Sequence, residues 1–163
     1  MKKLIIFSLI SGSISLSAVD DSFSLEQAAQ VMAKAIEKEA RTACLVDKNY
    51  EVKIVVADEN TSRIGMDLAI SKGRAAVFFS GYKHEQRKAL NETTNNGLKQ
   101  QLLQANLSPT TGSLGIMCGD KLYGIGVMSE GGILSTKDAY TQDDEVAKEI
   151  IKKLKGCKLI AIQ

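Results

Sequence analysis

The 163-residue sequence has no tryptophan, one proline, one histidine and only 5% aromatic residues. Its 21 lysines and arginines are nearly balanced by 19 aspartates and glutamates. Proteins that bind DNA or RNA usually carry a marked excess of positive charge on one face. We therefore expect no nucleic-acid partner.

The motifs of common catalytic and metal sites are also missing. The three cysteines, Cys44, Cys118 and Cys157, form no CxxC or Cys/His spacing, so a zinc site has no ligand cluster. No nucleophile-elbow motif is present, and a single histidine without a fixed serine or cysteine partner gives little support for a hydrolase. We expect no catalytic residue. Two of the three cysteines can pair in an oxidising compartment, and the sequence leaves open which two.

The N-terminus has the order of a secretory signal peptide. Lys2 and Lys3 precede a short apolar run, residues 4–10, and small residues follow up to Ala18. The apolar run is shorter than the roughly 20 residues that span a bilayer, so no stable membrane anchor is expected after cleavage. We predict a signal peptide over residues 1–17, a mature domain over residues 18–163, and a periplasmic or secreted location.

A mature chain of this length forms one domain with its own core. A capping box at Ser24–Gln27 followed by helical spacing of apolar residues predicts a first helix to about Arg41. The remaining expected elements are a strand over 51–58, a helix over 65–79, one or two short helices over 82–104, strands over 114–118 and 121–128, a helix over 141–154 and a closing strand over 159–162.

Gly119 and Asp120 form a two-residue link between apolar runs, which is a strong hairpin signal. Strands joined by hairpins favour an antiparallel sheet with helices packed against it, so we predict a single α+β domain. Gly124 and Gly126 match the first two glycines of the dinucleotide-binding motif GxGxxG, but Ser129 stands at the third glycine position. The two glycines also lie inside the second hairpin strand, which argues against a dinucleotide-binding loop. Glycines there indicate a bulge, or close packing of another backbone or a ligand.

Five stretches together resemble the GlcG/HbpS haem-binding family, which also occurs as the C-terminal domain of PduO-type proteins. The matching stretches are residues 24–28, 55–58, 68–76, 124–127 and 142–147. The resemblance implies a profilin-like antiparallel sheet flanked by helices, assembly as a homo-oligomer, and haem or a related tetrapyrrole as ligand.

Three site residues follow from that expected ligand. His84 is the only histidine, and imidazole is a common ligand of haem iron, so it is the predicted metal-binding residue. Lys72 and Arg74 lie in a matching stretch and are candidates to bind the haem carboxylates. They are about 200° apart on a helical wheel, so at most one should face the ligand. Solvent-exposed charges are the alternative explanation for all three residues.

Other chemistry remains open at this point. Tyr82, Met128 and Cys118 are weaker candidates for the iron ligand. Three acidic residues, Asp58, Glu59 and Asp67, could form a paired carboxylate site. We favour the alternative, in which they belong to a loop and a capped helix start. The leading hypothesis is an exported, non-enzymatic haem-binding protein; the alternatives are a haem-degrading enzyme and an oligomeric interaction module without ligand.

Overall fold

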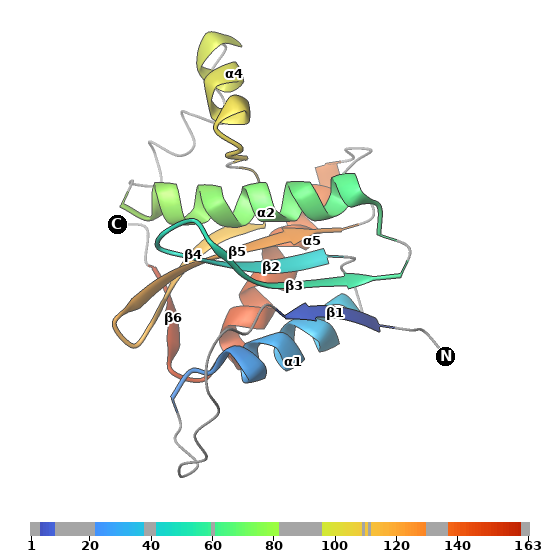
Figure 1. Cartoon of the computed structure of the whole chain (residues 1–163), viewed down its shortest axis with the longest axis vertical. Coiled ribbons are helices and arrows are strands. Elements are labelled where there is room, and N and C mark those ends of the chain that lie inside the picture. Colours follow the sequence, from blue (N-terminus) through green and yellow to red (C-terminus); the bar gives the residue numbers. More distant parts are fainter. Residues whose placement is uncertain are drawn as a thin grey trace.

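The computed structural model describes residues 4–8, 22–37, 42–59, 61–81, 96–108, 110, 112–129 and 137–160. A six-stranded antiparallel sheet in the order β1-β3-β2-β5-β4-β6 lies between helices, with α2 on one face and α1 and α5 on the other (Figure 1). The strands are β1 (Leu4–Ser8), β2 (Thr42–Asp47), β3 (Val52–Asp58), β4 (Ser113–Cys118), β5 (Lys121–Met128) and β6 (Cys157–Leu159). The helices are α1 (Leu25–Ile36), α2 (Arg63–Phe78), α4 (Asn96–Gln104) and α5 (Lys137–Lys153), and a 3-10 turn covers Phe79–Gly81. The predicted α+β domain is confirmed.

Helix α1 begins as predicted, because the Ser24 hydroxyl accepts a hydrogen bond from the Gln27 amide at 3.1 Å. It ends at Ile36, earlier than the predicted end near Arg41, which lies outside the described residues. Strand β2, which includes Ala43, was not among the predicted elements. Strand β2 is buried on both faces, so its short apolar run has no alternation to distinguish it from helix.

Strand β2 separates two cores. Ala43 and Leu45 pack in the core shared with α1 and α5, whereas Cys44 and Val46 pack in the core under α2. This alternation is the two-residue period of a strand that is covered on both sides. The sheet therefore forms the middle layer of three.

The C-terminal half agrees closely with expectation. Strands β4 and β5 form the predicted hairpin, with Gly119 at a φ of 61° in the turn. Helix α5 begins at Lys137, before the predicted residue 141, and Val146 and Ile150 on the helix and Leu154 directly after it are buried. The closing strand β6 begins at Cys157, two residues before the predicted start.

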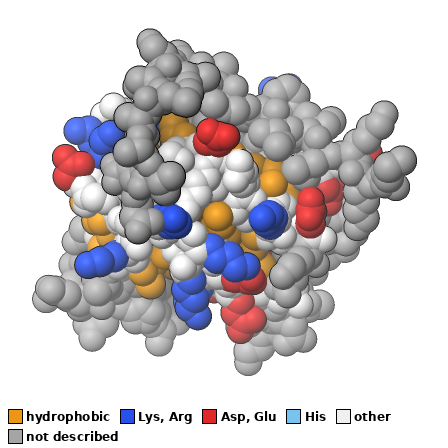
Figure 2. All heavy atoms as spheres, turned by 90° about the horizontal axis from the view of Figure 1, so that it is seen from below, with side chains coloured by type: hydrophobic (Ala, Val, Ile, Leu, Met, Phe, Trp, Pro, Cys, Tyr) orange, Lys and Arg blue, Asp and Glu red, His pale blue; other side chains and the backbone are white. Residues whose placement is uncertain are grey.

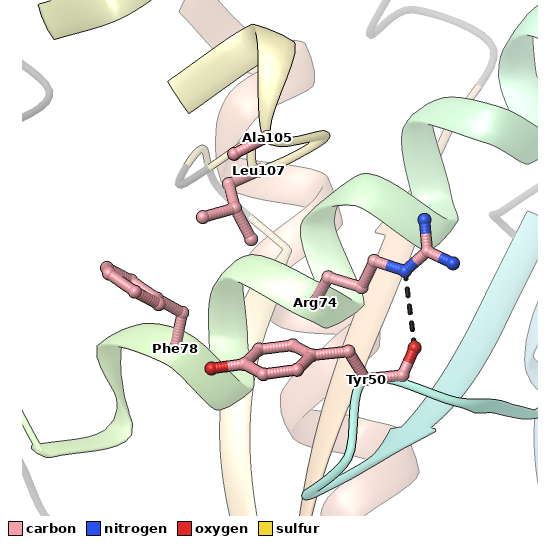
Figure 3. A pocket seen from close by; sticks show the side chains of 5 residues that line it. All are labelled: Tyr50, Arg74, Phe78, Ala105 and Leu107. Atoms are coloured by element: carbon pink, nitrogen blue, oxygen red, sulfur yellow. Dashed lines mark hydrogen bonds between the residues drawn. The ribbon is translucent and has the colours of Figure 1, made fainter. Parts of the chain in front are cut away.

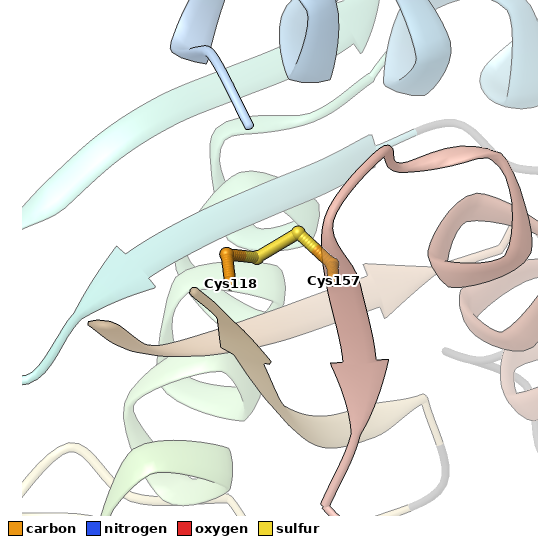
Figure 4. The surroundings of a disulfide bond; sticks show 2 residues. All are labelled: Cys118 and Cys157. Carbon is orange, nitrogen blue, oxygen red and sulfur yellow. A yellow bond between two sulfur atoms is a disulfide. The ribbon is translucent and has the colours of Figure 1, made fainter. Parts of the chain in front are cut away.

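The disulfide that the sequence left open joins Cys118 and Cys157, which are partners in the β4–β6 ladder (Figure 4). It ties the end of the chain to the edge of the sheet. Cys44 remains a buried thiol whose Sγ donates to the Ala69 carbonyl at 2.9 Å. Burial raises the pKa of the Cys44 thiol to about 12, so the sulfur stays protonated and unreactive at neutral pH.

The apolar part of the predicted signal peptide forms edge strand β1, which pairs with β3 from Leu4↔Asp58 to Ser8↔Ile54. Removal of residues 1–17 would take away this edge strand and leave the ladders between the other strands intact. Among the described residues, no helix is both long and apolar enough to cross a membrane. On the face seen in Figure 2, basic and acidic side chains both occur, with hydrophobic side chains visible between them.

Helix α2 packs on β5 with almost no space between the two backbones. A Cβ atom on Gly124 would lie 2.1 Å from the Gly73 carbonyl oxygen, and one on Gly126 would lie 2.0 Å from the Ala69 carbonyl oxygen. Gly73 itself has Cys44 Sγ and Val46 Cγ2 at 2.8 Å from the position of its missing Cβ. Of the predicted explanations for the strand glycines, close packing of another backbone is the correct one.

We expect Gly124→Ala to reduce the free energy of unfolding by about 3 kcal/mol or more, because its methyl group would meet a backbone oxygen that cannot move without shifting α2. Gly115→Ala, in neighbouring strand β4, is the matched control. Its added carbon would come no nearer than 3.3 Å to any atom, so its cost should stay below about 1.5 kcal/mol. Urea denaturation of both variants measures the difference, and equal destabilisation would contradict the close helix contact.

Candidate functional site

Lys72 and Arg74 have different surroundings although both lie on α2. The Lys72 side chain is only 6% exposed, and its Nζ donates to the Val127 carbonyl at 2.8 Å and to Asp143 Oδ2 at 2.6 Å. Arg74 is partly exposed, and its Nε donates to the Tyr50 carbonyl, in the turn between β2 and β3, at 3.3 Å. The two side chains therefore contact different parts of the protein.

The Lys72–Asp143 ion pair is the centre of a buried polar network. Asp143 Oδ1 accepts a hydrogen bond from the Ser129 amide at 2.8 Å, so both carboxylate oxygens are occupied. The Ser113 hydroxyl donates to the Lys72 carbonyl at 2.7 Å, and Asp144 Oδ1 accepts from the Gly112 amide at 2.6 Å. These bonds join α2, α5 and the ends of β4 and β5.

Such a network holds elements together and commits the Lys72 side chain to contacts inside the protein. Its ammonium donates to two internal oxygen acceptors, and a ligand carboxylate would compete with Asp143 at a buried position. Arg74 is the better placed of the two predicted carboxylate-binding residues, since its guanidinium reaches the surface. The assignment of either residue to a ligand stays a prediction.

The Arg74 side of α2 borders a cavity of about 360 Å³ lined by Tyr50, Arg74, Phe78, Ala105 and Leu107 (Figure 3). Tyr50 and Phe78 are 41% and 39% exposed, so both side chains offer apolar surface beside Arg74. The volume lies within the range of small-molecule sites, which are mostly apolar with a few polar groups. The combination suits a largely apolar ligand with an anionic group.

Three separate segments supply the walls of this cavity. Arg74 and Phe78 are one turn apart on α2, so their side chains lie on the same face of the helix. Leu107 follows α4, and its segment is held to α2 by a hydrogen bond from the Ser108 amide to the Ser71 carbonyl at 3.2 Å. Tyr50 comes from the turn between β2 and β3.

The turn that carries Tyr50 is built around Asp47. Asp47 Oδ1 accepts hydrogen bonds from the Asn49 amide at 2.8 Å and the Glu51 amide at 3.1 Å, and Lys53 Nζ lies 3.0 Å from Asp47 Oδ2. Burial by itself raises the pKa of Asp47, but the hydrogen bonds from Lys53, Glu51 and Asn49 bring this pKa below its ordinary value. The carboxylate is thus ionised at neutral pH and holds the turn closed.

The other predicted iron ligands are distributed as follows. His84 and Tyr82 lie outside the described residues. Met128 is buried in the core under α2. Cys118 was a wrong candidate, because its sulfur is bonded to Cys157 and has no thiolate to offer.

Two of the three acidic residues Asp58, Glu59 and Asp67 have contacts with neighbouring side chains. Asp58 Oδ1 accepts from the Thr61 hydroxyl at 3.3 Å at the end of β3, and Asp67 lies on α2 at 4.0 Å from Arg63 on the surface. These contacts suit the loop and helix-start explanation, which stays a prediction. Within the described part of the chain, no cluster of three or more histidine, cysteine or acidic side chains is arranged to hold a metal ion.

The sequence analysis missed Tyr50, Phe78 and Leu107 as cavity residues. The helix predicted over 65–79 includes both Phe78 and Phe79, but only Phe79 is buried, at 1% exposed. The signal that was available is the polar stretch Asp47–Asn49, which predicts a turn and hence an exposed aromatic residue at Tyr50.

No protein-family model and no curated protein matches this sequence. Solved structures do match its fold. The PduOC:haem complex aligns with a TM-score of 0.62 at 17% identity, covering 86% of this chain and 96% of that chain. The Klebsiella pneumoniae protein ORFY aligns with a TM-score of 0.60 at 19% identity, covering 86% and 97%. HbpS aligns with a TM-score of 0.58 at 18% identity, covering 90% and 97%.

These alignments extend over nearly the whole length of each solved chain. The protein therefore has the fold of the GlcG/HbpS family, as the resemblance in its sequence implied. At 17–19% identity the alignments establish the architecture, and the ligand must be argued from the residues of this chain.

We expect Asp143→Ala to destabilise the fold by about 3–5 kcal/mol, because it leaves the Lys72 ammonium buried without a counter-ion. The double variant Lys72→Met/Asp143→Ala removes both charges and should be more stable than Asp143→Ala alone. Urea denaturation of Asp143→Ala, Lys72→Met and the double variant gives the interaction energy. Additive effects of the two single substitutions would contradict a coupled pair.

Proposed function

We propose that this chain is an exported, non-enzymatic protein that binds haem or a related tetrapyrrole. The observation that carries the proposal is the cavity beside α2, in which an arginine and two exposed aromatic side chains face one space. The fold supports it, because a protein of the same architecture was solved as a haem complex.

The cavity residues suit the chemistry of a tetrapyrrole. The flat macrocycle has wide apolar faces, which Phe78 and Leu107 can cover. Its carboxylates need a cationic partner, and the Arg74 guanidinium offers two parallel donors at the rim. A bound haem would supply an iron with axial positions open to a protein ligand.

Export is supported by two independent features. The charge order and short apolar run at the N-terminus are those of a signal peptide. The Cys118–Cys157 disulfide is a bond that persists in oxidising compartments and is rare in the cytosol. The proposal that the protein is not an enzyme rests on its sequence, which has no nucleophile and base motif, and a homo-oligomer stays a prediction of the resemblance.

Titration of the mature protein with hemin should give saturable one-to-one binding with a shifted Soret band. Arg74→Ala should weaken binding about 10- to 100-fold, because one charge-assisted hydrogen bond of about 1.5–3 kcal/mol is lost.

Arg63→Ala is the matched control for Arg74→Ala. Arg63 lies on the same helix, its side chain is 90% exposed and it does not line the cavity, so its loss should leave the affinity unchanged. A wild-type spectrum no different from that of hemin with an unrelated protein would refute haem binding. Catalase-resistant loss of the Soret band on adding reductant and oxygen would instead indicate a haem-degrading enzyme.

Protein recovered from the native cell should begin at Ala18, or at Val19 if the peptidase cuts one residue later. Small residues at positions 15 and 17 suit cleavage after Ser17. N-terminal sequencing or intact mass measurement checks this. Soluble, folded protein that retains Met1 would contradict export.

A further inference from the structure

Tyr50 has a backbone conformation that is costly for its residue type. Its φ is 65°, in the left-handed region, where glycine and asparagine are common and a bulky aromatic residue is rare. The hairpin position it occupies, after a tight turn and before β3, is one that glycine ordinarily fills. A tyrosine kept at such a position indicates a use for its side chain.

The surrounding turn fixes Tyr50 in place. Its amide donates to the Asp47 carbonyl at 3.0 Å, and its carbonyl accepts from Arg74 Nε at 3.3 Å. The Asp47 carboxylate closes the same turn through two further amides. Both peptide groups of the strained residue are thus held, which fixes the direction of its Cα–Cβ bond.

That direction leads into the cavity. The Tyr50 ring extends from the turn along α2 toward Phe78, with the hydroxyl at its far end (Figure 3). The Arg74 guanidinium lies at the other end, beside the Tyr50 carbonyl. A flat dianionic ligand that placed its carboxylates at Arg74 would extend over the phenol.

We propose that the Tyr50 hydroxyl oxygen is an axial ligand of the ferric iron of a haem bound in this cavity. The inference rests on the proposed function. Tyrosine is an established protein ligand of haem iron. Coordination transfers no electron: the phenol releases its proton to water, and its oxygen replaces a water molecule or chloride on the iron.

The first test compares Tyr50→Phe with the wild type, both loaded with hemin. The substitution keeps the ring and removes only the oxygen, so the phenolate-to-iron charge-transfer band and its resonance Raman modes should disappear and affinity should fall about tenfold. His84→Ala, which removes the ligand predicted from sequence, should leave these signals unchanged. Identical spectra of Tyr50→Phe and wild type would overturn the proposal, as would the loss of the signals in His84→Ala.

The second test separates a binding role from a structural one. Tyr50→Gly relieves the left-handed backbone, so its urea midpoint should equal or exceed that of the wild type, while the charge-transfer band is lost. A lower midpoint would show that the ring is kept for packing and would overturn the argument from strain. Hemin binding by the wild type with unchanged Tyr50→Phe spectra defeats only this inference, whereas no hemin binding at all defeats the proposed function.

Discussion

The contact between helix α2 and strand β5 is the constraint on which the other features depend. Gly124 and Gly126 have no side chains on this face, so the helix carbonyls of Gly73 and Ala69 occupy the space that two Cβ atoms would take. Contact at this distance fixes both the separation of the helix from the sheet and its rotation about its own axis. Any such rotation would bring a bulkier residue against the strand. The position of every side chain on α2 follows from it.

The buried ion pair is a consequence of that fixed rotation. With Gly73 against the sheet, the preceding residue Lys72 points to the end of β5, where Asp143 of α5 completes its coordination by oxygen. Removing two charges from water is expensive, so the pair contributes little net stability. The pair instead fixes geometry, because Lys72 and Asp143 contact each other only when α2 and α5 keep their observed relative positions. Arg74, two residues from Lys72, is thereby turned to the solvent side.

Elements with a local signature could be predicted from the sequence, and those defined by tertiary contacts could not. The Ser24 cap, the Gly119 turn and the apolar stripe of α5 all lie in short stretches of sequence. Strand β2 was missed because burial on both faces removes its alternation. Lys72 was grouped with Arg74 because a helical wheel gives the angle between two residues but not the partner that each one meets. Tyr50 was missed because the cavity gathers residues from three segments.

The candidate site combines rigid and strained parts in a way that explains its location. Arg74 and Phe78 lie on the helix that the glycine contact holds in place, so ligand binding does not have to order the backbone that carries them. Tyr50 stands on a turn whose backbone is unfavourable by itself and is maintained by Asp47 and Arg74. Arg74 therefore serves both parts, because its Nε holds the turn while its side chain forms part of the cavity wall. A ligand carboxylate bound at Arg74 would contact the same side chain whose Nε holds the Tyr50 carbonyl, which links the two ends of the site.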